Sequence, residues 1–451
     1  MTSDISTPTP EISCHFKRWK RNRDVLAGED AVKAAGQSYL PKLPSQSSAD
    51  YLAYNASVDF FPAAQRVHES RLGLIFRKDP VAIGGEGYED VLATISRRYS
   101  LDELARELAS ETLVTNFTGV LVDSPAQPSG LSAAQAIADG YRPFVELYRA
   151  ESILEVTREV IRNRFALTRV RLLDDAVTVR ELILIDGVYQ VIMHRKIGSD
   201  WVEDAPIIPT KGGQPLGEIP FKVVSTVAGA ISPPKAPIDD LALMNLAHFR
   251  AQAQHSNVLR HIASPIRNIT GIATDGGEAP FVVSPDSVWL FESEATKVNI
   301  SEHSGAGVAA LKEHCDSLID QMAAIGDRVL QTEKAAAEAA ETLAIRRAAE
   351  GSILAAMAKT VATQLETMVN LAMDWMRAAP ISYSLNTDFM PIAMTAQDIT
   401  ALLAVVQAGR MSSETFFSIL KAGEVVDDGL DYETEKARID QDTVDAPPTG
   451  I

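Results

Sequence analysis

The chain has 451 residues, of which 46% are hydrophobic, and a formal net charge of -18. This composition supports a folded core and excludes wholesale disorder, and the length suits two to four structural units. The acidic balance argues against a protein that grips nucleic-acid phosphates tightly. Two distant cysteines, Cys14 and Cys315, provide neither a disulfide framework nor a zinc pattern. The start does not read as a signal peptide, and we expect no membrane partner because uncharged apolar runs of about 18 residues are lacking.

The first part of the chain is predicted to be mainly helical. Residues 1–16 are polar, and we expect a flexible arm there. A basic cluster then surrounds Trp19 within His15–Glu29. We interpret it as a solvated helix face, with a binding patch for an acidic partner or nucleic acid as the alternative. Helical patterns continue to about Leu113, after which FTGVLVD predicts a short strand.

The middle of the chain changes from helical to β patterns. Two helices are predicted between Ser132 and Ile161, in AAQAIADG and ESILEVTREVI. From Ala166 to Lys196, three runs bounded by Asp/Gly turns predict an antiparallel meander. PFKVVSTVA predicts a further strand. These patterns together predict an α+β fold.

A helix, a small β-rich insert and a second helix come next. Pro237–His261 predicts the first helix, with Asp239 and Asp240 near the positive end of its dipole. We expect both carboxylates to act as cap and solvated charges. The insert covers Ile266–Ile300 and has glycines at its turns, and Gly305–Ile325 predicts the second helix.

The longest predicted element is a single helix over Glu333–Arg377, which would be about 67 Å long. Its first part is rich in alanine, and Gly351 is the expected bend. Its second part places an apolar stripe at helical spacing, formed by Leu354, Met357, Val361, Leu365, Met368, Ala372 and Trp375. A strand, two further helices and an acidic tail, expected to be frayed, complete the chain.

The sequence lacks the common catalytic and cofactor motifs. It contains no phosphate-binding G-x-x-x-x-G-K-[ST], no G-x-S-x-G and no H-E-x-x-H. The glycines of Gly305–Ala310 fit a helix start better than a dinucleotide fingerprint. His248, His255 and His261 lack carboxylates or cysteines that would complete a metal site. We therefore predict no enzyme activity, no catalytic residue, no metal and no cofactor.

The order of these elements resembles that of the portal proteins of tailed bacteriophages. A mixed α/β region precedes a helix, a small β insert, a helix, a short loop and a very long helix. Several segments of the sequence are also similar to those of a phage portal-like family formerly described only as a domain of unknown function. The similar segments lie between about residues 17 and 435 and include YLPKLPSQSSADYLAY, RLGLIFRKDP, GEIPFKVV, PIDDLALMNLAHFRAQAQHSNVLRHIASPI, MAAIGDRVL and AIRRAAEGSILAAMA.

The resemblance implies a portal-like layout with an α/β wing, a two-helix stem, a β-rich clip, a long wing helix and a short helical crown. By position, the parts would be a flexible arm (1–16), the wing (17–236), the first stem helix (237–263), the clip (264–304), the second stem helix (305–326), a tunnel loop (327–334), the long wing helix (333–377), a wing return strand (378–394), the crown (395–424) and an acidic tail (425–451).

The resemblance also implies a function. Such chains form a ring of about twelve copies at one capsid vertex, assembled in the host cytoplasm, through which double-stranded DNA is packaged and ejected. The implied partners are other copies of the chain, the large terminase of the packaging motor, head–tail adaptor or neck proteins, the major capsid protein and weakly held DNA.

Several residues are candidates for these contacts. The candidates for the DNA tunnel are Arg328, Gln331 and Lys334, although Arg328 and Lys334 also fit ordinary solvated charges at a helix end. The candidates for partner binding on the clip are Asp275, Glu278, Asp286 and Trp289.

Two other classes of protein stay open as alternatives. A different ring-forming, scaffold or neck component of a phage particle would suit the alanine-rich helix but leaves the β meander and the β insert unexplained. An enzyme with an unrecognised site would need a nucleophile, base or metal pattern that the sequence does not offer.

Overall fold

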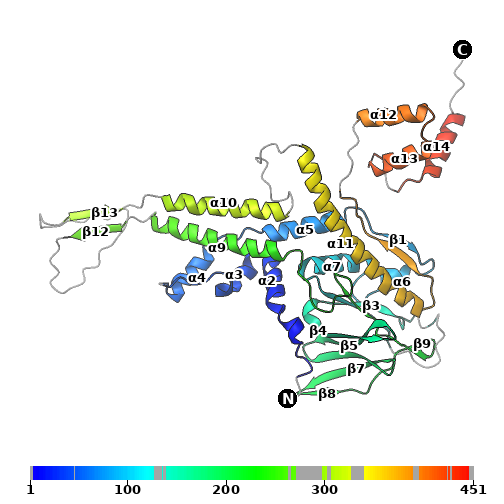
Figure 1. Cartoon of the computed structure of the whole chain (residues 1–451), viewed down its shortest axis with the longest axis horizontal. Coiled ribbons are helices and arrows are strands. Elements are labelled where there is room, and N and C mark those ends of the chain that lie inside the picture. Colours follow the sequence, from blue (N-terminus) through cyan, green and yellow to red (C-terminus); the bar gives the residue numbers. More distant parts are fainter. Residues whose placement is uncertain are drawn as a thin grey trace, which may run out of the picture.

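The computed structural model describes residues 4–44, 46–125, 135, 139–262, 266–270, 297–301, 306–326, 340–389, 396–423, 425–426 and 429–445. The predicted α+β class is confirmed, since helices and antiparallel strands both contribute to the core (Figure 1). The helices are α1 (Pro10–Ser13), α2 (Phe16–Ala27), α3 (Glu29–Ala34), α4 (Ser48–Ala56), α5 (Ala63–Ile75), α6 (Glu89–Ala93), α7 (Leu101–Val114), α9 (Asp239–Ile262), α10 (Ala306–Gly326), α11 (Ala340–Trp375), α12 (Ala396–Gln407), α13 (Ser413–Ala422) and α14 (Tyr432–Asp445), with short 3-10 turns at Gly36–Ser38 and Ala150–Ser152.

The strands form small sheets with antiparallel pairing. They are β1 (Val81–Gly84), β2 (Thr118–Asp123), β3 (Phe144–Tyr148), β4 (Ile153–Ile161), β5 (Arg164–Asp175), β6 (Thr178–Ile185), β7 (Val188–Ile197), β8 (Asp200–Glu203), β9 (Thr210–Lys211), β10 (Gln214–Pro215), β11 (Phe221–Val224), β12 (Ile266–Thr270), β13 (Lys297–Ser301) and β14 (Ile381–Ser384). The largest sheet has the order β4-β5-β6-β7-β8, and a second sheet has the order β11-β2-β3. The predicted antiparallel meander is therefore confirmed.

The helix predicted for ESILEVTREVI is wrong, because this segment is strand β4. It pairs with β5 over its whole length, from Ile153 opposite Leu172 to Ile161 opposite Arg164. Its β-branched residues suit a strand, and the ladder to β5 outweighs the helix-like spacing of its apolar residues. The helix predicted for AAQAIADG lies mostly outside the described residues.

The three-stranded sheet β11-β2-β3, called the central sheet below, lies between the helices and the five-stranded sheet. On β2, Val120 and Val122 face the core that α7 and α11 share, whereas Leu121 faces the five-stranded sheet. This alternation is the period-two pattern of a strand buried on both faces. At Gly119, a Cβ atom would lie 2.6 Å from the ring of Phe221 on neighbouring β11, so the close fit requires glycine.

The apolar stripe predicted on the long helix is confirmed. Leu354, Met357, Val361, Leu365, Met368 and Ala372 are buried in the core of α7, the central sheet and β14, and Trp375 packs against its margin. Residues 333–339 of the predicted helix lie outside the described residues, and α11 is described from Ala340.

Two further expectations are corrected at the chain ends. In place of a flexible arm over residues 4–16, α1 packs on the five-stranded sheet with Ile12 buried, and the Thr9 amide donates to the Leu154 carbonyl at 2.9 Å. In place of a frayed acidic tail, the chain forms α14, whose Tyr432 ring lies 5.7 Å from that of Phe417 on α13. In both segments a few apolar side chains anchor an otherwise polar stretch.

Candidate functional site

A two-helix arm projects from the body of the molecule and is the most distinctive candidate site (Figure 1). Helices α9 and α10 run side by side, and the antiparallel hairpin β12–β13 lies at their far end. The two ends of the predicted β-rich insert are thus strands, as expected, and residues 271–296 lie outside the described residues. At the usual rise per residue, α9 extends about 36 Å.

The arm is fixed at its base by apolar packing. On α9, Leu241, Leu246 and Phe249 are buried against side chains of α2, α3, α4 and α5, and Met322 of α10 joins the same cluster. Further out, Ala251 packs against Cys315 and Leu318. This small apolar cluster joins the two helices beyond the base of the arm.

A buried carboxylate positions the first turn of α9. Asp239 is only 3% exposed. Its two oxygens accept hydrogen bonds from Asn22 at 2.7 Å, from Arg21 at 3.1 Å and from the Ala236 amide at 2.9 Å. Arg18 forms an ion pair with it at 3.5 Å. Asp239 thus acts as a cap, as expected, through the Ala236 amide, but the expectation that it is solvated is wrong. Neighbouring Asp240 is exposed, as expected, and pairs with Lys235.

The basic cluster around Trp19 divides into two sets, because Lys17 and Lys20 are exposed, as expected for a solvated face, whereas the arginines are paired within the fold. Arg18 and Arg21 bind Asp239, and Arg23 binds both Glu111 and Glu151 through paired hydrogen bonds. Although burial opposes it, these hydrogen bonds raise the pKa of Arg23. The acidic partners come from α7, the turn before β4 and α9, which a reading of the sequence alone could not pair with α2.

Side-chain amides add a second layer of contacts at the base of the arm. Asn245 accepts a hydrogen bond from the Ala64 amide at 3.0 Å and donates to the Phe61 carbonyl at 2.8 Å. Asn116 donates to the Lys235 carbonyl at 2.9 Å, just before α9 begins. The start and rotation of α9 are thus set by polar groups of fixed geometry.

His248 lies on α9 between the body and α10. Its ring is buried, lies 6.0 Å from the ring of Phe61, and leaves Nδ1 without a hydrogen-bond partner. Burial lowers the pKa of His248, and Asp316 on α10 opposes this effect. His248 is therefore a buried packing residue at the base of the arm.

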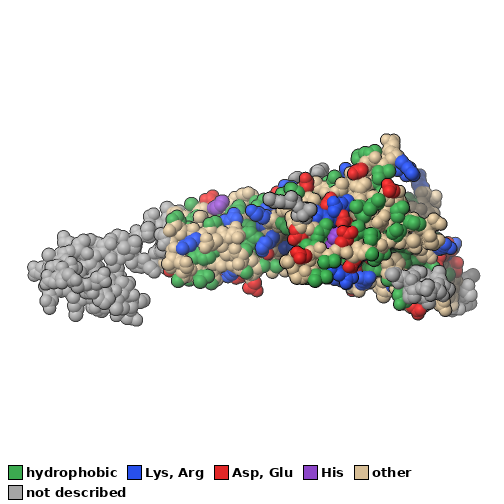
Figure 2. Space-filling view, turned by 90° about the horizontal axis from the view of Figure 1, so that it is seen from below, with side chains coloured by type: hydrophobic (Ala, Val, Ile, Leu, Met, Phe, Trp, Pro, Cys, Tyr) green, Lys and Arg blue, Asp and Glu red, His purple; other side chains and the backbone are tan. Residues whose placement is uncertain are grey.

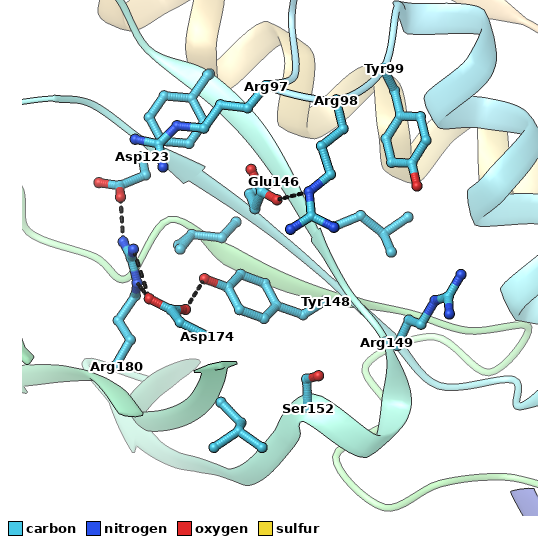
Figure 3. A pocket seen from close by; sticks show the side chains of 14 residues that line it. Arg97, Arg98, Tyr99, Asp123, Glu146, Tyr148, Arg149, Ser152, Asp174 and Arg180 are labelled. Atoms are coloured by element: carbon cyan, nitrogen blue, oxygen red, sulfur yellow. Dashed lines mark hydrogen bonds and ion pairs between the residues drawn. The ribbon is translucent and has the colours of Figure 1, made fainter. Parts of the chain in front are cut away.

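A charged cavity of about 430 Å³ lies between the central sheet and the five-stranded sheet (Figure 3). On one wall Arg180 pairs with Asp123 and Asp174, and the Tyr148 hydroxyl donates to Asp174 at 2.6 Å. On the other wall Arg98 lies 3.8 Å from Glu146. Burial raises the pKa of Glu146, while Arg98 and Arg97 oppose this shift. No sequence motif marks this cavity, because its residues come from five separate segments.

The candidate residues for DNA and clip contacts cannot be compared with the structure. The tunnel candidates Arg328, Gln331 and Lys334 lie outside the described residues, as do the clip candidates Asp275, Glu278, Asp286 and Trp289. Gly351 lies within α11, and a Cβ atom there would meet nothing within 4 Å. The bend at Gly351 stays a prediction.

The described residues present neither a metal-binding cluster nor a membrane-spanning helix. Among them, no group of three or more His, Cys, Asp or Glu side chains is arranged to hold a metal ion. None of their helices combines the length and apolarity needed to cross a membrane.

Figure 2 shows acidic and basic side chains interspersed over one face of the body.

Comparisons with known proteins show similarity to one family model and to several solved structures. The model of a family described as "Domain of unknown function (DUF4055)" matches residues 237–376, which span α9 through α11. No curated protein matches the chain. Among solved structures, the chain is similar to one from the neck of an empty GTA particle, with a TM-score of 0.41, 13% identity and coverage of 84% of this chain and 94% of the other. It is also similar to one from the virion of a native gene transfer agent (GTA) particle, with a TM-score of 0.40, 13% identity and coverage of 88% and 98%.

Proposed function

We propose that this chain is a portal protein of a tailed bacteriophage, which forms a ring at one capsid vertex and conducts double-stranded DNA. The observation that carries the proposal is the arm together with the long helix after it. Two long helices enclose a β-hairpin, and only thirteen residues separate α10 from the 36-residue helix α11. This is the order of stem, clip, stem, tunnel loop and wing helix that the sequence resemblance implies.

The buried contacts of the arm support this proposal. A stem that lines a channel needs a fixed direction relative to the body, and Asp239 and Asn245 provide directed contacts at its base. The body then corresponds to the wing, the β12–β13 hairpin to the clip, and α12 and α13 to the crown. The terminase motor and later the head–tail adaptor would dock on the clip, and the major capsid protein would surround the ring.

The acidic composition also suits a conduit. Each phosphate that a protein neutralises strengthens a salt-dependent grip on DNA, so a net charge of -18 favours sliding over binding. In this proposal DNA is held only weakly, and Arg328, Gln331 and Lys334 touch it at the narrowest point.

The ring itself is tested by imaging the purified full-length chain in negative stain at several salt concentrations. We expect rings with a central channel and about twelve subunits, because closed assemblies arise from one repeated heterologous interface. A monomer or dimer at all salt concentrations would reject the proposal.

The tunnel residues are tested by DNA packaging with the double substitution Arg328→Glu and Lys334→Glu. We expect shorter or poorly retained packaged DNA. The matched control is Arg162→Glu with Arg164→Glu, which makes the same change in charge at the turn between β4 and β5. If the tunnel variant packages and retains DNA as the control does, the assignment of these residues is wrong.

A further inference from the structure

A second cavity adjoins the one between the sheets, and together they form a groove rich in arginine. This cavity has a volume of about 310 Å³ and shares Arg97 and Phe144 with the first. Its walls also include Arg142. We call Arg97, Arg98 and Arg142 with the two cavities the arginine groove.

The three arginines are poorly neutralised by the described part of the chain. The Arg97 guanidinium lies 3.9 Å from the centre of the Phe144 ring and has no carboxylate of a described residue within ion-pair distance. Arg98, whose side chain is 73% exposed, has only the Glu146 contact at 3.8 Å. Arg142 donates through Nη2 to the Thr94 carbonyl at 2.8 Å, and its buried Nη1 has no hydrogen-bond partner among the described residues.

The other charges around the groove are already paired. Arg180 binds Asp123 and Asp174, and Arg149 binds Glu107 and Glu111. Among the lining residues that the structure describes, this leaves three arginines and a single unpaired carboxylate, Glu146, to balance them. Guanidinium groups with free N–H edges bind carboxylates through paired, charge-assisted hydrogen bonds.

We propose that the arginine groove binds a carboxylate-rich segment of a second copy of this chain. A copy with 60 acidic and 42 basic residues offers such segments, and copies of this charge repel one another unless local contacts compensate. The choice of a second copy rests on the proposed ring, in which one surface of each subunit meets a different surface of the next. Asp and Glu side chains can enter cavities of this size, whereas a DNA duplex is too wide.

The first test measures assembly of the full-length chain carrying Arg97→Glu and Arg98→Glu. Both side chains are exposed, so the variant is expected to fold normally. We expect the concentration at half assembly, measured by mass photometry, to rise by roughly tenfold or more, because like charges then face each other. The matched control is Arg162→Glu with Arg164→Glu. If both double variants assemble like wild type, or if both lose assembly equally, the groove has no specific role.

The second test identifies the bound segment directly. A photo-crosslinking amino acid is placed at position 98 in a mixture of ¹⁴N- and ¹⁵N-labelled chains. We expect crosslinks that join a light and a heavy chain through an acidic segment. Crosslinks only within one chain, crosslinks to added DNA, or none at all would overturn the inference. Suppose instead that the chain with the crosslinker at position 98 forms intermolecular crosslinks but the wild-type chain forms no rings. That result would reject the portal proposal but keep the groove as a contact between copies.

Discussion

The two long helices α9 and α11 are held to the body by different kinds of contact. The base of α9 is positioned by a buried carboxylate and by side-chain amides, in addition to apolar packing. Helix α11 instead buries a continuous apolar face, to which Gln364 and Asn370 add side-chain amide hydrogen bonds with the backbone of Ser225 and Ile381. Burial of apolar area stabilises a helix without fixing its orientation, whereas hydrogen bonds to buried groups do fix that orientation. The comparison teaches that the projecting helix adds a buried charge, Asp239, to the kind of amide contact that both helices use.

The largest effect should come from the apolar face of α11. Leu365→Ala removes a fully buried side chain from the main core and should lower the free energy of unfolding by about 3–4 kcal/mol, because a cavity adds to the lost transfer free energy. Chemical denaturation measures this value. The matched control on the same helix is Ile353→Ala, which changes a side chain that is 74% exposed and should cost below about 0.5 kcal/mol. Similar losses for both would show that α11 is not held by its buried face.

A smaller effect is expected at the base of α9. Asp239→Asn keeps the shape of the side chain but leaves Arg18 and Arg21 without their carboxylate, which should cost about 2–3 kcal/mol. Hydrogen exchange should then accelerate in the first turns of α9 more than in α11. The neighbouring change Asp240→Asn affects an exposed pair and should cost below about 0.5 kcal/mol. Equal acceleration in both helices would contradict the distinct anchoring of α9.

The smallest effect concerns pH. Because burial lowers the pKa of His248 from its usual 6.5, the unfolded chain binds a proton here more readily than the folded chain does. Its contribution to stability is therefore present above about pH 6.5 and is lost as the pH falls. His248→Gln should flatten the fall in unfolding free energy between about pH 7.5 and pH 5.5. Burial lowers the pKa of His68 too, so only the difference between variant and wild type is diagnostic.

Local periodicity is enough to predict much of the fold. The stripe on α11, the antiparallel meander and the helix–insert–helix arm are each encoded within one continuous stretch of sequence. The strand β4 escapes such a prediction because its apolar spacing also fits a helix, and only its partner β5 decides between them. Long-range pairing is not visible in a local pattern.

The candidate site is harder to predict for the same reason. The basic residues of α2 look like a surface when read alone, but their acidic partners lie as far away as Asp239. The arginine groove combines segments around Arg97, Arg142 and Arg180, which the topology of the sheets brings together. A charge count along the sequence cannot tell a paired arginine from an unpaired one.

The contact between Asn22 and Asp239 also dictates an order of events during synthesis. The two residues are 217 positions apart, so at roughly 5–20 residues per second the ribosome needs about 10–40 s to supply the partner. Meanwhile Asn22 can already bind the Val114 carbonyl at 2.9 Å. The binding site for Asp239 can therefore form before α9 is made, and α11, which follows the arm in the chain, completes the main core only afterwards.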